Sequence, residues 1–286
     1  MKSLIIGSQG LVGTALTRCL PDAVRGVQME AKNKQEMYID IIKYETMFKA
    51  FSIHRPRVVY MAGAITDVNK CEDRGTSVVN VKGTIEALRL CEQFECKFVF
   101  YSSSYVFDGT KQSPYTPQDD TSPLQMYGRQ KETVERLILS SDATCLVLRT
   151  VGIFGQERKR KNFAQQVIKS VFAGKDVYAP TDQYMNPIWS NDLAQISVKL
   201  AQSSAHGVFH VSGDTCLSKF EFAQRIAGYF GYESKVLPLT TPEMNQRAPR
   251  PKMGCLDCSD LLDLGIEIPS LDNALQKFLG SDFLNG

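Results

Sequence analysis

A tyrosine and a lysine four residues apart could carry out proton transfer. Tyr127 and Lys131 form the pattern YxxxK. On a helix, this spacing places both side chains on one face, with their Cβ atoms about 5–6 Å apart. A phenol with a pKa of about 10 exchanges protons poorly at neutral pH, but a neighbouring cation stabilises the phenolate. The pair therefore predicts general acid–base chemistry, with an exposed surface pair as the alternative.

Hydroxyl groups gather just upstream of that pair. Ser102, Ser103 and Ser104 follow an apolar segment that is typical of a buried strand. In an open parallel sheet, ligands bind outside the carboxyl ends of the strands. A serine at such an end can donate a hydrogen bond to a substrate carbonyl while the tyrosine delivers a proton. The alternative is a polar strand end that caps a turn.

Three glycines precede the first helical segment. Gly7, Gly10 and Gly13 give GxxGxxG directly after the apolar run SLII. Without Cβ atoms, the backbone can turn tightly and approach a pyrophosphate, to which the helix N-terminus offers free N–H groups. The motif predicts a dinucleotide-binding turn, and close packing of strand and helix alone is the alternative.

The second strand bears on which dinucleotide is bound. NAD sites usually carry an acidic residue at the end of this strand, which binds a ribose hydroxyl. The sequence here is Arg25-Gly26-Val27-Gln28, with no carboxylate before Glu30. Arg25 suits a 2′-phosphate, which favours NADP and leaves NAD as the second choice. An exposed arginine at a strand end is the alternative.

Alternating strands and helices are predicted to position these residues. Segments with the pattern of buried strands are 3–7, 23–27, 57–64, 97–107, 145–155 and 207–213. Segments with helical spacing of apolar residues include 14–20, 44–54, 75–94 and 126–140. This alternation indicates an α/β fold with a doubly wound parallel sheet, the Rossmann arrangement.

The rhythm of strands and helices changes after Gly155. We predict a dinucleotide-binding unit over residues 1–155, completed by a return segment at about 186–213. The remaining segments, about 156–185 and 214–286, are predicted to form a smaller lobe that binds substrate.

The composition excludes several classes of protein. Of 286 residues, 43% are hydrophobic and 22% are charged, as in ordinary globular proteins, and the net charge is only +2. No strong field favours nucleic acid or an anionic membrane, and no apolar run approaches the ~20 residues of a membrane span. We expect a cytoplasmic protein with neither nucleic acid nor membrane as partner, and a homodimer is compatible with the sequence.

The eight cysteines are expected to be reduced structural thiols. Six are scattered singly among apolar residues, as buried cysteines often are. Cys255 and Cys258 have CxxC spacing, but no second Cys or His pair lies near them in the sequence to complete a zinc site. We therefore expect no metal.

Ordered motifs along nearly the whole chain resemble the extended short-chain dehydrogenase/reductases, and most closely their dTDP-4-dehydrorhamnose reductase branch. The motifs are GSQGLVG, HRPRVVYMAGAITDVNKCE, VVNVKGT, SSSYVFDGTKQSPYTPQDDTSPLQMYGRQK, LRTVGIFG and QRAPRPKMGCLDCSDLLDLGI. The resemblance implies a Rossmann domain that carries NAD(P)H and a smaller lobe over a nucleotide-linked sugar. The implied reaction is hydride transfer to the C4 ketone of a 4-keto-6-deoxy sugar.

The resemblance also implies roles for particular residues. Tyr127 would protonate the new alkoxide, Lys131 would hold the pKa of the tyrosine down, and Ser103 would polarise the ketone. The dinucleotide would contact Gly7, Gly10, Leu11, Val12 and Gly13 at its pyrophosphate, Asp40 and Ile41 at its adenine, Ala62, Gly63, Ala64, Ile65 and Thr66 along its length, and Tyr101, Tyr127 and Lys131 at its nicotinamide ribose.

On the substrate side, Ser104, Asn162 and Arg250 are the expected contacts. The planar guanidinium of Arg250 suits the oxygens of a diphosphate. A basic stretch could also reach the diphosphate through Arg158, Lys159, Arg160 or Lys161, although a solvated charge run is the more frequent case.

Two substrate-side positions depart from the family's pattern. Ser104 stands where the family has an aspartate, and Gly152 stands where it has a tryptophan. The residues implied for redox chemistry are intact, so these departures bear on which sugar is reduced.

Two other functions are compatible with the resemblance. The β-subunit of methionine adenosyltransferase keeps the dinucleotide fold but regulates a catalytic partner, and its C-terminal region is similar to QRAPRPKMGCLDCSDLLDLGI. A sugar epimerase or dehydratase of the same superfamily is the other alternative. Dehydratases generally need extra acidic residues beside the tyrosine, and Ser104 argues against one.

Overall fold

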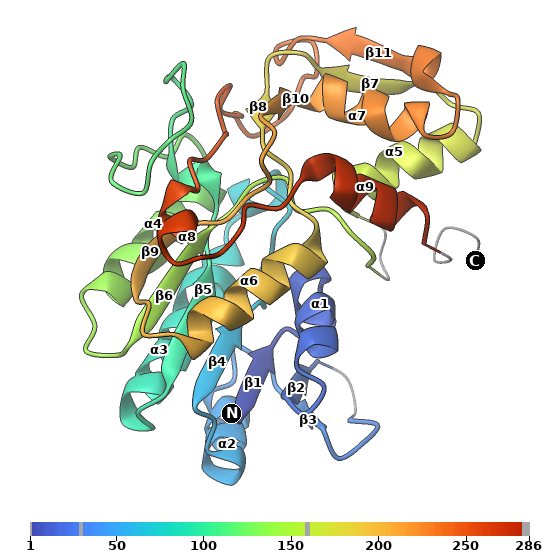
Figure 1. Cartoon of the computed structure of the whole chain (residues 1–286). Coiled ribbons are helices and arrows are strands. Elements are labelled where there is room, and N and C mark those ends of the chain that lie inside the picture. The colour runs from blue at the N-terminus through green and yellow to red at the C-terminus, as the bar shows by residue number, and fades with distance from the viewer. Residues whose placement is uncertain (1, 29–30, 158–160, 282–286) are drawn as a thin grey trace.

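The computed structural model describes residues 2–28, 31–157 and 161–281. Its main feature is a seven-stranded sheet of order β3-β2-β1-β4-β5-β6-β9 in which all pairings are parallel (Figure 1). The strands are β1 Ser3–Ile6, β2 Val24–Val27, β3 Glu36–Tyr38, β4 Val58–Met61, β5 Lys97–Tyr101, β6 Cys145–Arg149 and β9 Gly207–His210. The strand order reverses at β1, which confirms the predicted doubly wound α/β fold.

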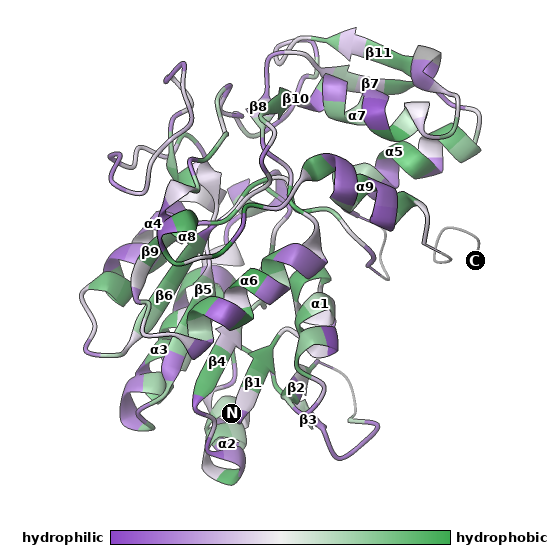
Figure 2. Cartoon of the chain, viewed as in Figure 1, coloured by the Kyte–Doolittle hydropathy of each residue, from purple (hydrophilic) through white to green (hydrophobic). Residues whose placement is uncertain are grey.

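Helices cover both faces of this sheet (Figure 1). They are α1 Leu11–Cys19 and α6 Ser190–Gln202 on one face, and α2 Tyr44–His54, α3 Thr84–Gln93 and α4 Met126–Leu139 on the other. Successive strand residues face opposite cores, so Ile5 packs with α1 and α6 while Leu4 packs with α2 and α3. Because both faces are buried, the strands are largely hydrophobic, as Figure 2 shows.

A smaller lobe lies beyond the carboxyl edge of the sheet (Figure 1). Its elements are α5 Phe163–Phe172, β7 Val177–Pro180, β8 Tyr184–Met185, β10 Leu217–Ser218, α7 Lys219–Gly228, β11 Val236–Leu239 and α9 Leu271–Leu279. β10 pairs with β8 and β11 pairs with β7, and one core of buried residues from α5, α7 and α9 holds the lobe together.

The C-terminal segment does not stay in this lobe. The short helix α8, Ser259–Asp263, follows a segment that returns to the large unit. Leu256, Leu261 and Ile266 are buried in the core that α1 and α6 form on the main sheet. The predicted boundary assigned all of 214–286 to the smaller lobe, whereas the structure packs residues 256–266 against the large unit.

The single helix predicted over 75–94 has two parts. A π-helical segment, Val78–Gly83, precedes α3. Gly83 lies against Ile41, since a Cβ on the glycine would be 2.7 Å from the Ile41 carbonyl oxygen. π-helical turns are rare and occur frequently at functional sites.

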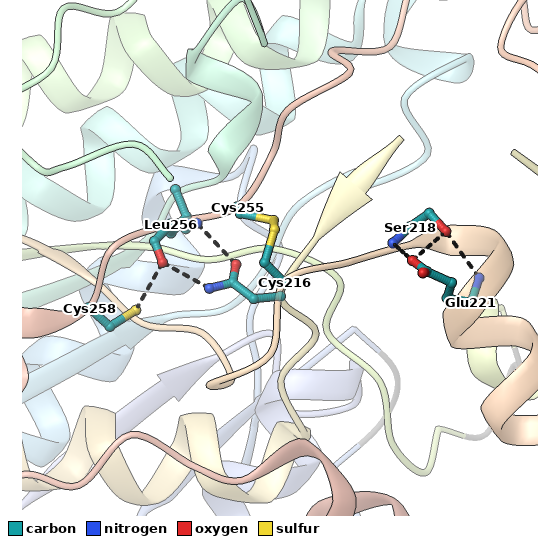
Figure 3. Close-up of a disulfide and its surroundings, with 7 residues drawn as sticks. Cys216, Ser218, Glu221, Cys255, Leu256 and Cys258 are labelled. Atoms are coloured by element: carbon teal, nitrogen blue, oxygen red, sulfur yellow. Dashed lines mark hydrogen bonds between the residues drawn. A yellow bond between two sulfur atoms is a disulfide. The ribbon is translucent and has the colours of Figure 1, made fainter. Parts of the chain in front are cut away.

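Two cysteines that were expected to be reduced form a disulfide. Cys216 and Cys255, 39 residues apart, are joined, whereas the other six cysteines are free (Figure 3). The expectation of a thiol was therefore wrong at these two positions. Cys216 precedes β10, which pairs with β8, and Gly254 donates its N–H to the Tyr184 carbonyl of β8. The pairing depends on this tertiary arrangement, which the spacing of cysteines in the sequence does not reveal.

Two kinds of feature are absent from the described residues. In that part of the chain, none of the helices has the length and hydropathy needed to cross a membrane. The same residues contain no group of three or more His, Cys, Asp and Glu side chains suited to a metal ion.

Candidate active site

The glycine turn lies at the carboxyl end of β1 and leads into α1. Gly7 has a φ of +85°, and a Cβ there would lie 2.5 Å from the Gly63 Cα atom. A Cβ on Gly13 would lie 2.1 Å from the Gly7 carbonyl oxygen. Backbone packing is by itself enough to require glycine at both positions.

Gly10 has a different environment. Among the described residues, a Cβ on Gly10 would meet the Gly7 carbonyl oxygen alone, at 3.5 Å. Gly10 is the N-cap of α1, where no side chain caps the helix and no acidic residue occupies the first turn. The open space lies in front of N–H groups and the positive end of a helix dipole, so the turn fits a pyrophosphate.

The loop that follows β4 lies beside this turn. Ala62 donates its N–H to the Ile6 carbonyl at 3.0 Å. Asn80, from the π-helical segment, accepts from the Ile65 N–H at 2.8 Å and donates to the Ile65 carbonyl at 3.0 Å. Its Nδ2 also donates to Gln130 Oε1 at 2.7 Å. These contacts hold the predicted dinucleotide segment 62–66 against α4, and the role of Gln130 was missed from the sequence.

The helix α4 carries Tyr127 and Lys131, as predicted. Both side chains are buried on the face of α4 that meets the sheet. Gly128 lets this helix approach the short 3-10 helix Ser104–Val106, because a Cβ there would lie 2.0 Å from the Tyr105 carbonyl oxygen. The structure therefore brings the tyrosine next to the serine-bearing end of β5.

The two side chains have different electrostatic environments. Lys131 Nζ donates to the Tyr101 carbonyl at 2.7 Å and lies 5.7 Å from the centroid of the Tyr127 ring. Burial lowers the pKa of Lys131 to about 8, and the carboxylate of Glu135 opposes that shift. Burial raises the pKa of Tyr127, so its phenol holds a proton at neutral pH. A protonated buried phenol beside an ammonium group can act as a general acid.

The three serines have three different partners. Their strand ends at Tyr101 rather than continuing to 107 as predicted. Ser102 donates to Glu135 on α4, and Ser103 Oγ accepts from the Tyr105 N–H at 3.2 Å. Ser104 is fully buried, and its hydroxyl has no hydrogen-bond partner among the described residues. Ser104 therefore holds a buried, unpartnered hydroxyl near the carboxyl edge of the sheet, and its contact with a substrate stays a prediction.

Two buried charged residues near these serines were not found from the sequence. Glu135 lies one turn after Lys131, and Arg149 ends β6. Arg149 Nη2 lies 2.8 Å from Glu135 Oε2. Glu135 and Arg149 are 14 residues apart on different elements, so no spacing rule pairs them. The one sequence signal is that Glu135 follows Lys131 by four residues, which places both side chains on one face of the helix.

Three residues were predicted to contact the adenosine half of the dinucleotide, and each has a different environment. Arg25 donates to the Pro21 carbonyl at 3.4 Å, near the amino end of β2 and away from the glycine turn. Asp40 accepts from the Ile42 N–H at 3.2 Å. Ile41 is buried against Gly83. The role of Arg25 at a 2′-phosphate stays a prediction, and it requires its side chain to turn around.

The predicted substrate residues on the smaller lobe are engaged within the chain. Asn162 caps α5 by accepting from the Gln165 N–H and donates to the Gly155 carbonyl. Arg250 donates to the Ala248 carbonyl at 2.6 Å and to Asn69 Oδ1 at 3.0 Å. Arg158, Lys159 and Arg160 lie outside the described residues.

Three comparisons relate the chain to known proteins. A family model described as RmlD substrate binding domain matches residues 1–282. The dTDP-4-dehydrorhamnose reductase of Aggregatibacter actinomycetemcomitans is 28% identical, over 96% of this chain and 97% of that protein. The methionine adenosyltransferase 2 subunit beta of Rattus norvegicus is 30% identical, over 93% of this chain and 83% of that protein.

A solved structure extends the likeness to the fold. The crystal structure of dTDP-4-dehydrorhamnose reductase from Bacillus anthracis in complex with NADP superposes with a TM-score of 0.89 and 26% identity, covering 97% of this chain and 99% of that one. The predicted resemblance is confirmed over nearly the whole chain. The chain therefore belongs to the RmlD substrate binding domain family, whose members include reductases of nucleotide-linked sugars.

Proposed function

We propose that this chain is an NAD(P)H-dependent reductase that delivers hydride to the C4 ketone of a nucleotide-linked 4-keto-6-deoxy sugar. One observation carries the proposal. Tyr127 and Lys131 are buried on α4, which packs against the short helix that follows Ser103, and the glycine turn at the same sheet edge fits a pyrophosphate. Similarity to dTDP-4-dehydrorhamnose reductases supports the class of substrate.

The bound dinucleotide would supply the hydride. Gly10, Leu11 and Val12 would hold its pyrophosphate through the N-terminus of α1. The 62–66 loop would contact the nicotinamide half, since Asn80 fixes it between the glycine turn and α4. NADP is the favoured form, because a similar structure contains it.

The chain's own residues would handle the proton and the developing charge. Tyr127 would donate its phenolic proton to the oxygen on C4 as the ketone becomes an alkoxide. Its raised pKa keeps that proton in place before reduction. The Lys131 ammonium would stabilise the phenolate that remains. Ser103 and the unpartnered hydroxyl of Ser104 would donate to oxygens of the sugar.

The smaller lobe would hold the rest of the nucleotide sugar. Arg250 is half-buried, and its guanidinium donates to Asn69 in the loop that follows β4 of the large unit. Its fork of N–H groups suits a diphosphate, and Asn162 lies at the start of α5 on the same lobe. Arg250→Ala should weaken saturable binding of a UDP- or dTDP-sugar, and unchanged affinity would remove this assignment.

Turnover against a panel of 4-keto nucleotide sugars tests the proposal. Oxidation of NADPH or NADH should be seen with at least one member. Tyr127→Phe should lower kcat by at least ~10²-fold, as expected on loss of a general acid. Tyr105→Phe is the control, since phenylalanine keeps the ring that packs edge-on against Tyr127. A wild-type rate in Tyr127→Phe would rule out the assigned role.

A regulatory subunit is the second candidate, because a relative of that name is 30% identical. In that case the chain should bind NADPH without turning over any sugar in the panel. It should also co-purify with a second, catalytic protein. Turnover that depends on Tyr127 would contradict this alternative.

A further inference from the structure

A carboxylate is buried where α4 meets two strands of the main sheet. The side chain of Glu135 is 2% exposed and that of its partner Arg149 is 6% exposed. Arg149 Nη2 lies 2.8 Å from Glu135 Oε2, and Arg149 Nε lies 3.1 and 3.2 Å from the two carboxylate oxygens. Ser102 donates its hydroxyl to the same carboxylate. The geometry is a bidentate, fully hydrogen-bonded ion pair.

This ion pair joins the elements that carry the proposed acid and hydroxyl donors. Glu135 lies on α4 with Tyr127 and Lys131, at i+8 and i+4. Ser102 immediately precedes Ser103 at the end of β5, and Arg149 is the last residue of β6. One carboxylate therefore connects the helix of the general acid to the ends of two central strands.

Arg149 extends the connection to the loop above the sheet. Its Nη1 donates to the Pro117 carbonyl at 3.2 Å. Its guanidinium carbon lies 5.1 Å from the centroid of the Phe107 ring. The loop between β5 and α4 is thereby tied to the same ion pair.

Stability alone does not account for this arrangement. The desolvation of two buried ions offsets most of their attraction, and apolar replacements of such pairs are often neutral or stabilising. Apolar neighbours are close in the chain, since Val134 and Val147 are both buried in the adjacent core. A role in placing other groups is the better explanation of a buried pair at this position.

We propose that Glu135 and Arg149 are positioning residues of the reductase site, which set α4 against the ends of β5 and β6. This inference rests on the proposed function. Both side chains are buried and hydrogen-bonded to each other, to Ser102 and to the Pro117 carbonyl, so we expect them to act through Lys131 and the serines.

Several groups face Lys131 and bear on its charge. Glu135 and Tyr127 come from α4, Cys71 comes from the short helix Lys70–Glu72, and the Tyr101 carbonyl comes from β5. Burial lowers the pKa of Lys131 to about 8, and Glu135 is the largest group that opposes it. Without that carboxylate, the charge of Arg149 would also be unopposed. The pKa of Lys131 would then fall further.

The test is the pH profile of Glu135→Gln. We expect kcat at neutral pH to fall at least tenfold and the alkaline limb of the profile to move about one pH unit lower, the size expected for loss of a nearby charge. The control is Glu132→Gln on the same helix, whose carboxylate pairs with Thr121 and Arg136. The control should keep the wild-type rate and profile. An unshifted profile in Glu135→Gln would overturn the inference.

Two further arms keep the outcome decisive. If Glu135→Gln does not fold, the variant Glu135→Gln/Arg149→Met removes both charges, and its rate should still be at least tenfold below wild type. A wild-type rate in this variant would refute the positioning role.

If wild type turns over no sugar, the proposed function fails. The pH dependence of NADPH affinity then decides the inference, because Glu135→Gln should weaken binding at a lower pH than in wild type, and identical curves would overturn it.

Discussion

At the scale of single residues, the sequence predicted the side chains that helical spacing brings to one face. Tyr127 and Lys131 are four residues apart on one helix, so their shared face follows from helical geometry. Arg149 and Asn80 instead act across elements, on Glu135 and Ile65 respectively. No spacing rule links residues that meet only after the sheet forms. Their roles became visible from burial and hydrogen bonds.

Lys131 should carry a cost in stability that its proposed catalytic role would explain. Its pKa is about 8 in the folded protein, below the usual value of a lysine, because burial disfavours the ammonium form. The unfolded chain therefore binds more protons between about pH 8 and 10.5, and folding stability rises with pH across that window. Below about pH 8 the cost is fully present.

We predict that Lys131→Met abolishes turnover but raises the melting temperature at pH 7. The gain should be about 1–3 kcal/mol, after allowing for the lost hydrogen bond to the Tyr101 carbonyl. It should shrink as the pH rises toward 10, because the wild-type lysine becomes neutral. Thermal unfolding of both proteins across this pH range is the measurement. A lower melting temperature of the variant at pH 7 would contradict this account.

At the scale of elements, the sequence indicated where most helices begin and end. α2 ends at His54, before Arg55-Pro56 as predicted, since a residue before proline avoids the helical region. The π-helical segment Val78–Gly83 was not foreseen. Its apolar spacing is indistinguishable from that of an α-helix, so the sequence pattern predicts one continuous helix.

The glycine turn yields a matched pair of substitutions. Gly10→Ala should leave the melting temperature nearly unchanged, because its Cβ would have a single contact at 3.5 Å among the described residues. The same substitution should weaken NADPH binding at least about tenfold, because the added Cβ would fill the space proposed for the pyrophosphate. Gly13→Ala should destabilise the fold by about 2 kcal/mol or more, because its Cβ would lie 2.1 Å from the Gly7 carbonyl oxygen. Calorimetry and NADPH titration measure both effects. Unweakened NADPH binding by Gly10→Ala would argue against a pyrophosphate at this turn.

At the scale of the whole molecule, the alternation of strands and helices was enough to predict the parallel sheet. The path of the C-terminal segment was not predictable, because the apolar residues Leu256, Leu261 and Ile266 could pack on either lobe. The disulfide was not predicted either, because its pairing also depends on tertiary packing. Its two cysteines flank β8 only in the folded chain.

The disulfide should stabilise the chain by restricting its unfolded state. A loop of 39 residues implies a contribution of up to about 4 kcal/mol from chain entropy. Cys216→Ser should therefore lower the melting temperature under oxidising conditions, and a reductant should lower that of wild type to the same level. Cys19→Ser, at a free and half-buried cysteine, is the control. Equal melting temperatures with and without reductant in wild type would show that this pair contributes nothing.

The destination of the hydride tests the central claim most directly. The chain should be incubated with NADPH that carries deuterium at its transferable position and with the nucleotide sugar that supports turnover. The account predicts deuterium on C4 of the sugar, with transfer lost in Tyr127→Phe and kept in Tyr105→Phe. Deuterium on another carbon, or transfer that persists at the wild-type rate without the Tyr127 hydroxyl, would contradict it.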